Sequence, residues 1–330
     1  MPAGVLTPVV RRRRRGRVRP KVALLVLAVG AAGGTAYALH ARSTHQPAAA
    51  ATPKPKHATA RTPASYRPPP KVPGLLTGPP RSTQPLRRPL AARAAIVVDA
   101  GTGRVLWALR PHRRLPVAST TKIMTALIAL EGLRPDALVR VPPAATRVPL
   151  VKEGLRPGER VRAWKLFDGL LVFSGNDDAM TLALAAGGTR PAFLARMNEK
   201  AHELGLNDSH FTSVSGVIDR GNYSSAWDLA ALTRVALRNS LFRQVVRRRI
   251  VHVPWSAPIY EKVYVNKNPL LGTYRGANGV KTGWTTLAGH CLVASATRGG
   301  RTIIAVLLHD ANAPADARRL LDLGFRATRA

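Results

Sequence analysis

The stretch PVASTTKIMTAL, Pro116–Leu127, places Ser119 and Lys122 three residues apart at the start of an apolar segment. The apolar residues that follow recur with the spacing of one buried helical face (Ile123, Met124, Leu127 and Ile128), which predicts a helix that begins near the serine. One interpretation makes Ser119 a helix N-cap and Lys122 a solvated side chain. The other makes Lys122 the base that takes a proton from the Ser119 hydroxyl.

Two further motifs lie downstream in other predicted elements. FSGN supplies Ser174 and Asn176, at a break between two helical segments within residues 165–187. VKTGW supplies four adjacent residues of a strand-like segment, Lys281, Thr282, Gly283 and Trp284. By average residue usage, SxxK and SxN each occur about once by chance in a chain of this length, and KTG is rarer. All three in this order, at a helix start, a helix break and a strand, are too specific a combination to be a coincidence.

The ordered triple is typical of penicillin-binding proteins and serine β-lactamases, and this sequence resembles that superfamily. More narrowly, residues 96–108, 197–211 and 279–298 resemble the D-alanyl-D-alanine carboxypeptidases of the low-molecular-mass penicillin-binding proteins. The resemblance covers about residues 93–330. It implies an α+β domain of the β-lactamase/DD-peptidase type, in which helices flank an antiparallel sheet and an all-α lobe is inserted.

The order of predicted elements favours the same architecture. Strand-like runs lie near both ends of the 93–330 segment, at residues 94–100, 104–109, 248–254, 279–284, 290–298 and 301–308. Helical patterns fill the middle at residues 165–187, 190–205 and 225–239, and a last one covers 315–325. We therefore expect one mixed domain whose sheet uses both ends of the segment.

The motifs also predict a catalytic chemistry. To act as a base, Lys122 must be neutral for part of the time, and both burial and a nearby cation such as Lys281 lower a lysine pKa. Ser174 is a candidate proton relay, and Asn176 can orient both Lys122 and a substrate amide. Lys281 and Thr282 can hold a substrate carboxylate.

The resemblance adds the reaction itself. It implies an oxyanion hole formed by the backbone N–H groups of Ser119 and Trp284. It implies an acyl-enzyme on Ser119, from which the terminal D-alanine of a peptidoglycan stem peptide has left and which water then hydrolyses. β-Lactams would be acylating inhibitors of the same serine. We expect neither a cofactor nor a metal ion.

The first 92 residues predict a membrane attachment. They hold 17 of the 51 basic residues and none of the 17 acidic ones, so residues 93–330, with 34 basic and 17 acidic residues, still carry +17. We expect a basic cytoplasmic segment (1–21), a transmembrane signal-anchor (22–39) and a disordered Pro/Ala-rich linker (40–92) before the catalytic domain (93–330). If Ala36–Ala38 is a signal-peptidase site, the protein is secreted instead of anchored in the cell membrane by a single span.

The basic run Arg11–Lys21 needs no nucleic acid to explain it. It directly precedes an apolar segment of membrane length, where it would orient the chain and attract anionic lipids. We therefore expect the catalytic domain on the extracytoplasmic side and no nucleic-acid partner. Cys291 lies in an apolar strand-like run, so we expect a buried, inert thiol.

Three departures from the family pattern stand out. The middle segment after the long helix is SVSGV, Ser213–Val217, where the family has an Asn-x-His/Asp-Gly-Leu-like sequence. Ala313 stands where an arginine that helps to bind the substrate carboxylate is common. We also expect neither the C-terminal β-rich domain nor the amphipathic anchor of many members.

Two alternative functions remain. A serine β-lactamase would use a glutamate in an ExxLN pattern, which Glu203–Asn207 matches, although we expect Glu203 to be a surface residue. A non-catalytic peptidoglycan- or β-lactam-binding protein would lack a motif residue, and none is missing.

Overall fold

The computed structural model describes residues 75–80, 86, 88–217, 220–256 and 259–328. The expected cytoplasmic segment, the expected membrane segment and most of the expected linker lie outside these residues. Within the described part of the chain, no helix is both long and apolar enough to cross a membrane.

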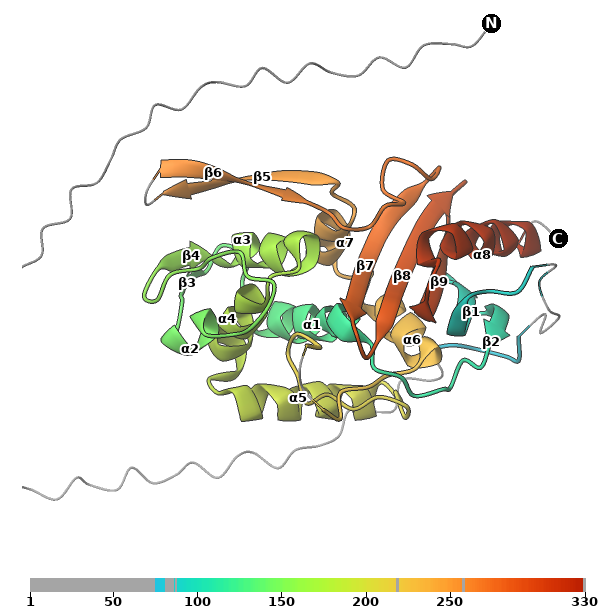
Figure 1. Ribbon diagram of the computed structural model, residues 1–330, viewed down its shortest axis with the longest axis horizontal. Helices are drawn as coiled ribbons and strands as arrows, with labels where there is room; N and C mark the ends of the chain where they lie inside the picture. Colours follow the sequence, from blue (N-terminus) through green and yellow to red (C-terminus); the bar gives the residue numbers. More distant parts are fainter. Residues whose placement is uncertain (1–74, 81–85, 87, 218–219, 257–258, 329–330) are drawn as a thin grey trace, which may run out of the picture. The chain divides into compact units, whose positions relative to one another are not determined.

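The central sheet has five antiparallel strands in the order β2-β1-β9-β8-β7 (Figure 1). Their bounds are Ala92–Asp99 (β1), Val105–Leu109 (β2), Ala277–Thr285 (β7), Gly289–Arg298 (β8) and Arg301–Asp310 (β9). Strands from the two ends of the segment meet where β1 pairs with β9, with Val97 opposite Ala305. This confirms the expected sheet, and it leaves β7, which carries the KTG motif, at one edge.

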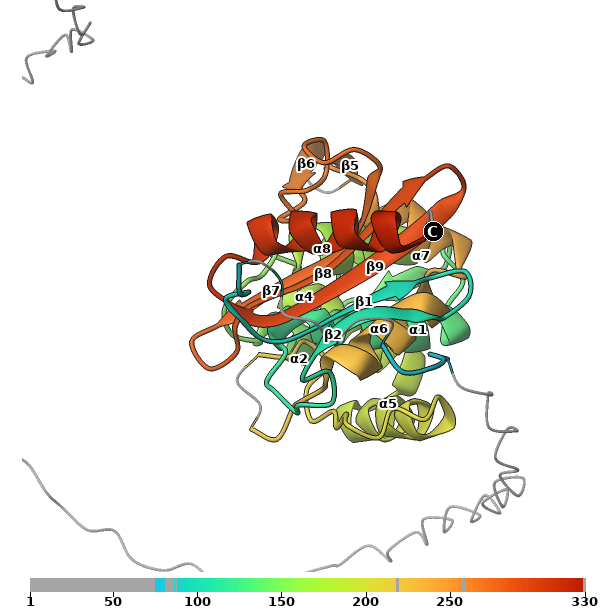
Figure 2. The same ribbon diagram turned by 90° about the vertical axis from the view of Figure 1, so that its right-hand side faces the viewer.

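Helices cover both faces of this sheet (Figure 2). Alternate residues of β1 point to opposite faces. Ala95 and Val97 pack in a cluster with helix α8 (Ala313–Ala327), whereas Ile96 and Val98 belong to the larger core beneath α1 (Lys122–Gly132) and α6 (Ala226–Ala236). The strands of the centre therefore read as continuous apolar runs because both of their faces are buried.

The insertion between β2 and β7 is mainly helical. It contains α1 and α6 together with α2 (Pro143–Thr146), α3 (Ala163–Asp168), α4 (Asn176–Gly187), α5 (Arg190–Glu203) and α7 (Ser240–Val246). The helices expected after Ser119 and at residues 165–187, 190–205 and 225–239 correspond to α1, to α3 and α4, to α5 and to α6. The expectation of an all-α lobe was nevertheless wrong in one respect. The insertion also carries two two-stranded sheets, β3 (Leu138–Arg140) with β4 (Arg160–Arg162), and β5 (Ile250–Ser256) with β6 (Ile259–Val265). β5 covers most of the strand-like run expected at residues 248–254, whereas β3 and β4, of three residues each, are too short to produce a recognisable alternation in the sequence.

The folded domain begins before residue 93, which corrects the expected linker boundary. Leu75 and Leu76 are buried in the main core, and the Thr77 N–H donates to the carbonyl of Gly103 over 2.9 Å. Arg234 donates to the Leu75 carbonyl over 2.7 Å. Burial of these two leucines against the main core stabilises the attachment of this segment to the domain. The proline-rich composition around them gave no sign of it in the sequence.

Candidate active site

Ser119 lies in a short 3₁₀ turn, η1 (Ala118–Thr121), that leads into α1. It does not cap the helix, because Thr121 is the N-cap residue of α1 and no side-chain cap bond forms there. Lys122 is completely buried rather than solvated. Both observations contradict the interpretation of this stretch as a capped helix with a surface lysine.

The side-chain nitrogen of Lys122 forms hydrogen bonds with residues of both the SxxK and the SxN motifs. Its Nζ lies 3.0 Å from Ser119 Oγ, 2.7 Å from Asn176 Oδ1 and 3.1 Å from the Ser174 carbonyl oxygen. Ser174 Oγ is more distant at 3.4 Å. The four predicted catalytic residues are therefore one hydrogen-bonded group.

Local backbone geometry presents the SxN motif to Lys122. A π-helical turn, Gly169–Phe173, ends at Ser174, which has the left-handed backbone angle φ +75° and breaks the helix. Asn176 then begins α4, and its Nδ2 donates to the carbonyl of Pro149 over 2.9 Å. This bond fixes the orientation of the amide, so the oxygen of Asn176 faces Lys122.

Burial favours the neutral form of Lys122. Desolvation lowers the pKa of Lys122 well below its usual range, and the charge of Lys281 lowers it further. Asp177 and Asp178 act in the opposite direction but contribute less. Burial, and after it the charge of Lys267, also lowers the pKa of Lys281 to about 7.

The acceptors around Lys122 determine where a neutral amine would point its lone pair. A neutral amine has two N–H donors and one lone pair, whereas the ammonium has three donors. The carbonyl oxygens of Ser174 and Asn176 can only accept, so they take both N–H groups. The lone pair then faces Ser119, whose O–H can donate to it.

The third motif packs directly against the serine. At Gly283 an added Cβ would lie 2.9 Å from the Ser119 nitrogen and 2.9 Å from the Val117 carbonyl oxygen, so only glycine allows this approach. Lys281 is buried and donates to the Thr282 carbonyl over 3.1 Å, while Thr282 itself is half-buried. Trp284 is 59% exposed beside His290, with 6.2 Å between the ring centres.

A family model described as D-alanyl-D-alanine carboxypeptidase, the S11 peptidases, matches residues 81–312. The chain belongs to this family. Its α+β fold of the DD-peptidase type is the one expected from the sequence.

Individual relatives agree with this membership. The chain is 33% identical over 245 residues to D-alanyl-D-alanine carboxypeptidase DacF of Bacillus subtilis, and the match covers 71% of this chain and 62% of DacF. It is 37% identical over 220 residues to DacB2 of Mycobacterium tuberculosis, covering 66% of this chain and 75% of DacB2. The crystal structure of the Streptomyces K15 DD-transpeptidase matches with a TM-score of 0.69 at 33% identity, covering 73% of this chain and 99% of that one. This chain thus spans less than two thirds of DacF and nearly all of the K15 enzyme.

The departure SVSGV from the family pattern contacts the serine turn. At Gly216, with φ +76°, an added Cβ would lie 1.9 Å from the Ala118 carbonyl oxygen. Thr125 of α1 donates to the Val214 carbonyl over 2.6 Å. The segment therefore supports the turn that carries Ser119, a role that the sequence did not indicate.

Sequence reasoning also missed the acidic pair that follows Asn176. Asp177 accepts hydrogen bonds from three consecutive backbone N–H groups, those of Glu153, Gly154 and Leu155, at 2.9 to 3.1 Å. Asp178 is fully buried, and neither of its oxygens has a hydrogen-bond partner among the residues that the structure describes. Desolvation raises the pKa of Asp178 well above its usual range. Two aspartates in the first turn of α4, directly after SGN, were the available signal.

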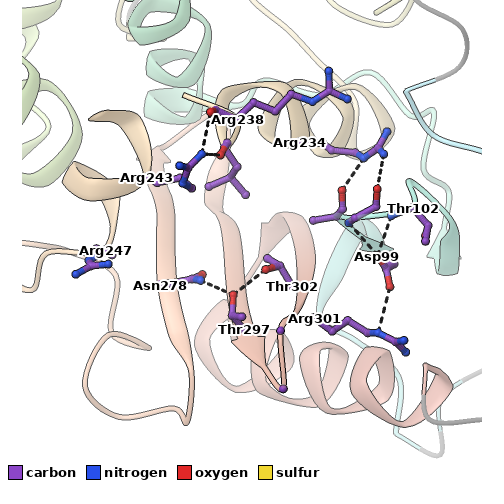
Figure 3. A pocket seen from close by; sticks show the side chains of 15 residues that line it. Asp99, Thr102, Arg234, Arg238, Arg243, Arg247, Asn278, Thr297, Arg301 and Thr302 are labelled. Carbon is purple, nitrogen blue, oxygen red and sulfur yellow. Dashed lines mark hydrogen bonds and ion pairs between the residues drawn. The ribbon is translucent and has the colours of Figure 1, made fainter. Parts of the chain in front are cut away.

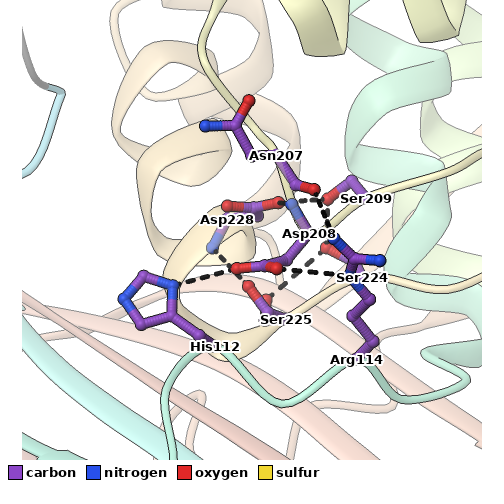
Figure 4. Close-up of polar contacts among 8 residues, drawn as sticks. All are labelled: His112, Arg114, Asn207, Asp208, Ser209, Ser224, Ser225 and Asp228. Atoms are coloured by element: carbon purple, nitrogen blue, oxygen red, sulfur yellow. Dashed lines mark hydrogen bonds and ion pairs between the residues drawn. The ribbon is translucent and has the colours of Figure 1, made fainter.

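The ExxLN pattern at Glu203–Asn207 begins at the last residue of α5, and Asn207 belongs to a network of polar contacts (Figure 4). The Asn207 carbonyl accepts a hydrogen bond from Arg114, whose Nε lies 3.2 Å from Asp208 Oδ1. Glu203 forms an ion pair with Lys200 at 2.8 Å, and its side chain is only 16% exposed, so it is less of a surface residue than expected. This loop holds the segment before Ser119 in place.

The other expectations concern single residues. Ala313 is buried at the first position of α8 and offers no positive charge. Cys291 is buried as expected, and burial raises the pKa of its thiol to about 11. Within the described ranges, no group of three or more His, Cys, Asp or Glu side chains could hold a metal ion.

Proposed function

We propose that this protein is a penicillin-sensitive serine D-alanyl-D-alanine carboxypeptidase that removes the terminal D-alanine of peptidoglycan stem peptides. The observation that carries this proposal is the buried Lys122, whose Nζ lies 3.0 Å from Ser119 Oγ and whose pKa is lowered. A neutral lysine in hydrogen-bond contact with a serine hydroxyl is an activated nucleophile.

In the acylation step, the Ser119 oxygen attacks the carbonyl carbon of the penultimate D-alanine while its proton passes to Lys122. The peptide C–N bond then breaks, and the departing D-alanine nitrogen takes up a proton, for which the Ser174 hydroxyl is the relay. The N–H groups of Ser119 and Trp284 stabilise the oxyanion. The contact between Gly283 and the Ser119 nitrogen supports this assignment, because it brings β7 and the serine turn to one place.

Substrate binding uses the edge of β7. Lys281 and Thr282 face the substrate carboxylate, and Asn176 faces its amide. Water then hydrolyses the ester on Ser119 and frees the shortened peptide. A β-lactam acylates the same serine, but its leaving nitrogen stays attached through the ring and remains near the ester.

We also propose that residues 22–39 anchor the protein in the cell membrane, with the catalytic domain on the extracytoplasmic side. The support is the 18-residue apolar stretch that directly follows the basic run Arg11–Lys21.

Labelling with a fluorescent penicillin tests the mechanism. We expect a covalent label on the wild type and on a control, Ser240→Ala, which changes an exposed serine at the start of α7. We expect no label on Ser119→Ala. An unlabelled wild type refutes the serine mechanism.

Two further measurements separate the alternatives. Release of D-alanine from a D-Ala-D-Ala pentapeptide is expected from the carboxypeptidase and not from a non-catalytic binding protein. A β-lactamase would release penicilloyl product in many turnovers, whereas the proposed enzyme retains its label.

A further inference from the structure

A polar cavity of about 710 Å³ lies at the end of the sheet where β7 begins (Figure 3). It is lined by the connection from α6 to α7 and by the turns that join β1 to β2 and β8 to β9. Five arginines line it, Arg234, Arg238, Arg243, Arg247 and Arg301, against a single acidic residue, Asp99. We call it the arginine pocket.

Part of its charge is used inside the fold. Asp99 accepts hydrogen bonds from the N–H groups of Gly101 and Thr102, at 2.9 and 3.0 Å, and lies 3.8 Å from Arg301 Nε. Arg234 donates over 2.7 Å each to three backbone carbonyls, those of Leu75, Ala100 and Gly101. These two residues hold the β1–β2 turn and leave little capacity for a ligand.

The remaining arginines are available. Arg238 and Arg247 are exposed. Within the part of the chain that the structure describes, their guanidinium groups form no hydrogen bond or ion pair. Arg243 uses Nη1 for the carbonyls of Leu237 and Arg238, which leaves its other nitrogens open. Five positive charges against one negative give the arginine pocket a net charge of +4.

We propose that the arginine pocket binds a linear polymer that carries repeated oxyanion groups, phosphodiester or carboxylate. The guanidinium group matches such groups with paired N–H donors. The volume of the cavity is within the range of small-molecule sites, so it accommodates a short run of repeats.

The composition of the lining fits two other anionic partners, a nucleic acid and an anionic membrane, less well. It includes no aromatic side chain, so a nucleobase has no ring on which to stack. A membrane-binding surface would present aromatic or large aliphatic side chains for insertion, and Leu237 is the one large apolar residue of the lining. The repeated charge of an extracytoplasmic wall polymer fits this surface better.

The arginine pocket is separate from the catalytic group. Asn278, in its lining, stands near the start of β7, whereas Gly283, which touches Ser119, stands near the end of that strand. A bound polymer would therefore hold the enzyme in the wall without occupying its active site. Its binding does not depend on the proposed reaction.

The test compares two double variants of the full chain. Arg238→Ala with Arg247→Ala removes two available pocket cations, and Arg113→Ala with Arg160→Ala removes two exposed arginines elsewhere. The probes are a glycerol-phosphate oligomer and a poly-glutamate oligomer of equal charge, with inorganic phosphate as the monomer, measured by calorimetry at several salt concentrations. Both variants keep the N-terminal basic run, so only the difference between them reports on the pocket.

We expect saturable binding of at least one oligomer by the wild type, and the oligomer that binds more tightly identifies the oxyanion. The pocket variant should raise its Kd on the order of tenfold and should lower the slope of log Kd against log salt by about 1 for each arginine removed. The control variant should change neither quantity, and D-alanine release and thermal stability should be unchanged in both. Arginine-selective labelling with phenylglyoxal should show that the polymer protects Arg238 and Arg247.

Four outcomes overturn the proposal. The first is that the wild type binds the oligomers no better than inorganic phosphate, and the second is that the two double variants lose affinity equally. The third and fourth are that anionic lipid vesicles, or a single-stranded oligonucleotide, bind through the same two arginines at least as tightly as either oligomer.

Discussion

Replacing Asn176 by aspartate should move the pH dependence of acylation, because it places a carboxylate against the proposed base. The amide oxygen of Asn176 lies 2.7 Å from Lys122 Nζ, and aspartate has nearly the same shape. The exchange keeps the shape of the side chain and adds one negative charge beside Lys122, but it also removes the N–H group that donates to the Pro149 carbonyl.

The distance gives the size of the effect. Two unit charges 2.7 Å apart attract by about 1.5 kcal/mol at the dielectric constant of water and by about 6 kcal/mol at an effective value of 20. This corresponds to about 1 to 4 pKa units, and opposite charges at such distances shift pKa values by about 1 to 3 units. The shift raises the pKa of Lys122, so less of the neutral amine is present at any pH below it. Acylation should therefore fall about 10- to 1,000-fold near neutral pH and recover as the pH rises.

The assay is the second-order rate constant of acylation by a fluorescent penicillin, measured across pH for wild type and variant. The matched control is Asn198→Asp, because the Asn198 Nδ2 likewise donates to backbone carbonyls, those of Leu194 and Phe211, in a segment remote from the SxxK motif. The control should lose stability without a change in its pH profile. If Asn176→Asp has the wild-type pH profile, Lys122 is not the base.

Three further predictions concern stability and reactivity. Gly216→Ala should destabilise the domain clearly more than Gly221→Ala in urea unfolding. Both glycines have positive φ, which costs an alanine about 1–2 kcal/mol, but only at Gly216 would the added Cβ also clash with Ala118. The pKa of Asp178 is raised in the folded state, so this group favours folding only while it stays protonated, and the free energy of unfolding should fall as pH rises above about 4. Asp178→Asn should make this fall less steep in Tm measurements across pH. Equal slopes for wild type and variant would contradict the prediction. Cys291 should react with a maleimide only after unfolding, and labelling of the native protein would show that its burial is not maintained.

Much of this domain could be predicted from local signals in the sequence. The runs at β1, β2, β8 and β9 are long, apolar and bounded by glycine turns, and the break at Ser174 has strong helix signals on both sides. The burial of Leu75–Leu76 and the supporting role of the SVSGV segment were missed because both come from contacts with residues far away in the sequence. No local pattern indicates that Gly216 must leave room for Ala118.

The same distinction applies to the catalytic group. Motif order predicted Ser119, Lys122 and Asn176 as one group, but the lowered pKa of Lys122 depends mainly on burial and then on Lys281, which belongs to an edge strand about 160 residues away. That cation is correctly placed only when the insertion has docked on the sheet. The proposed base therefore depends on the assembled domain for its lowered pKa, and a partly opened domain would carry an ordinary, protonated lysine beside an inactive serine.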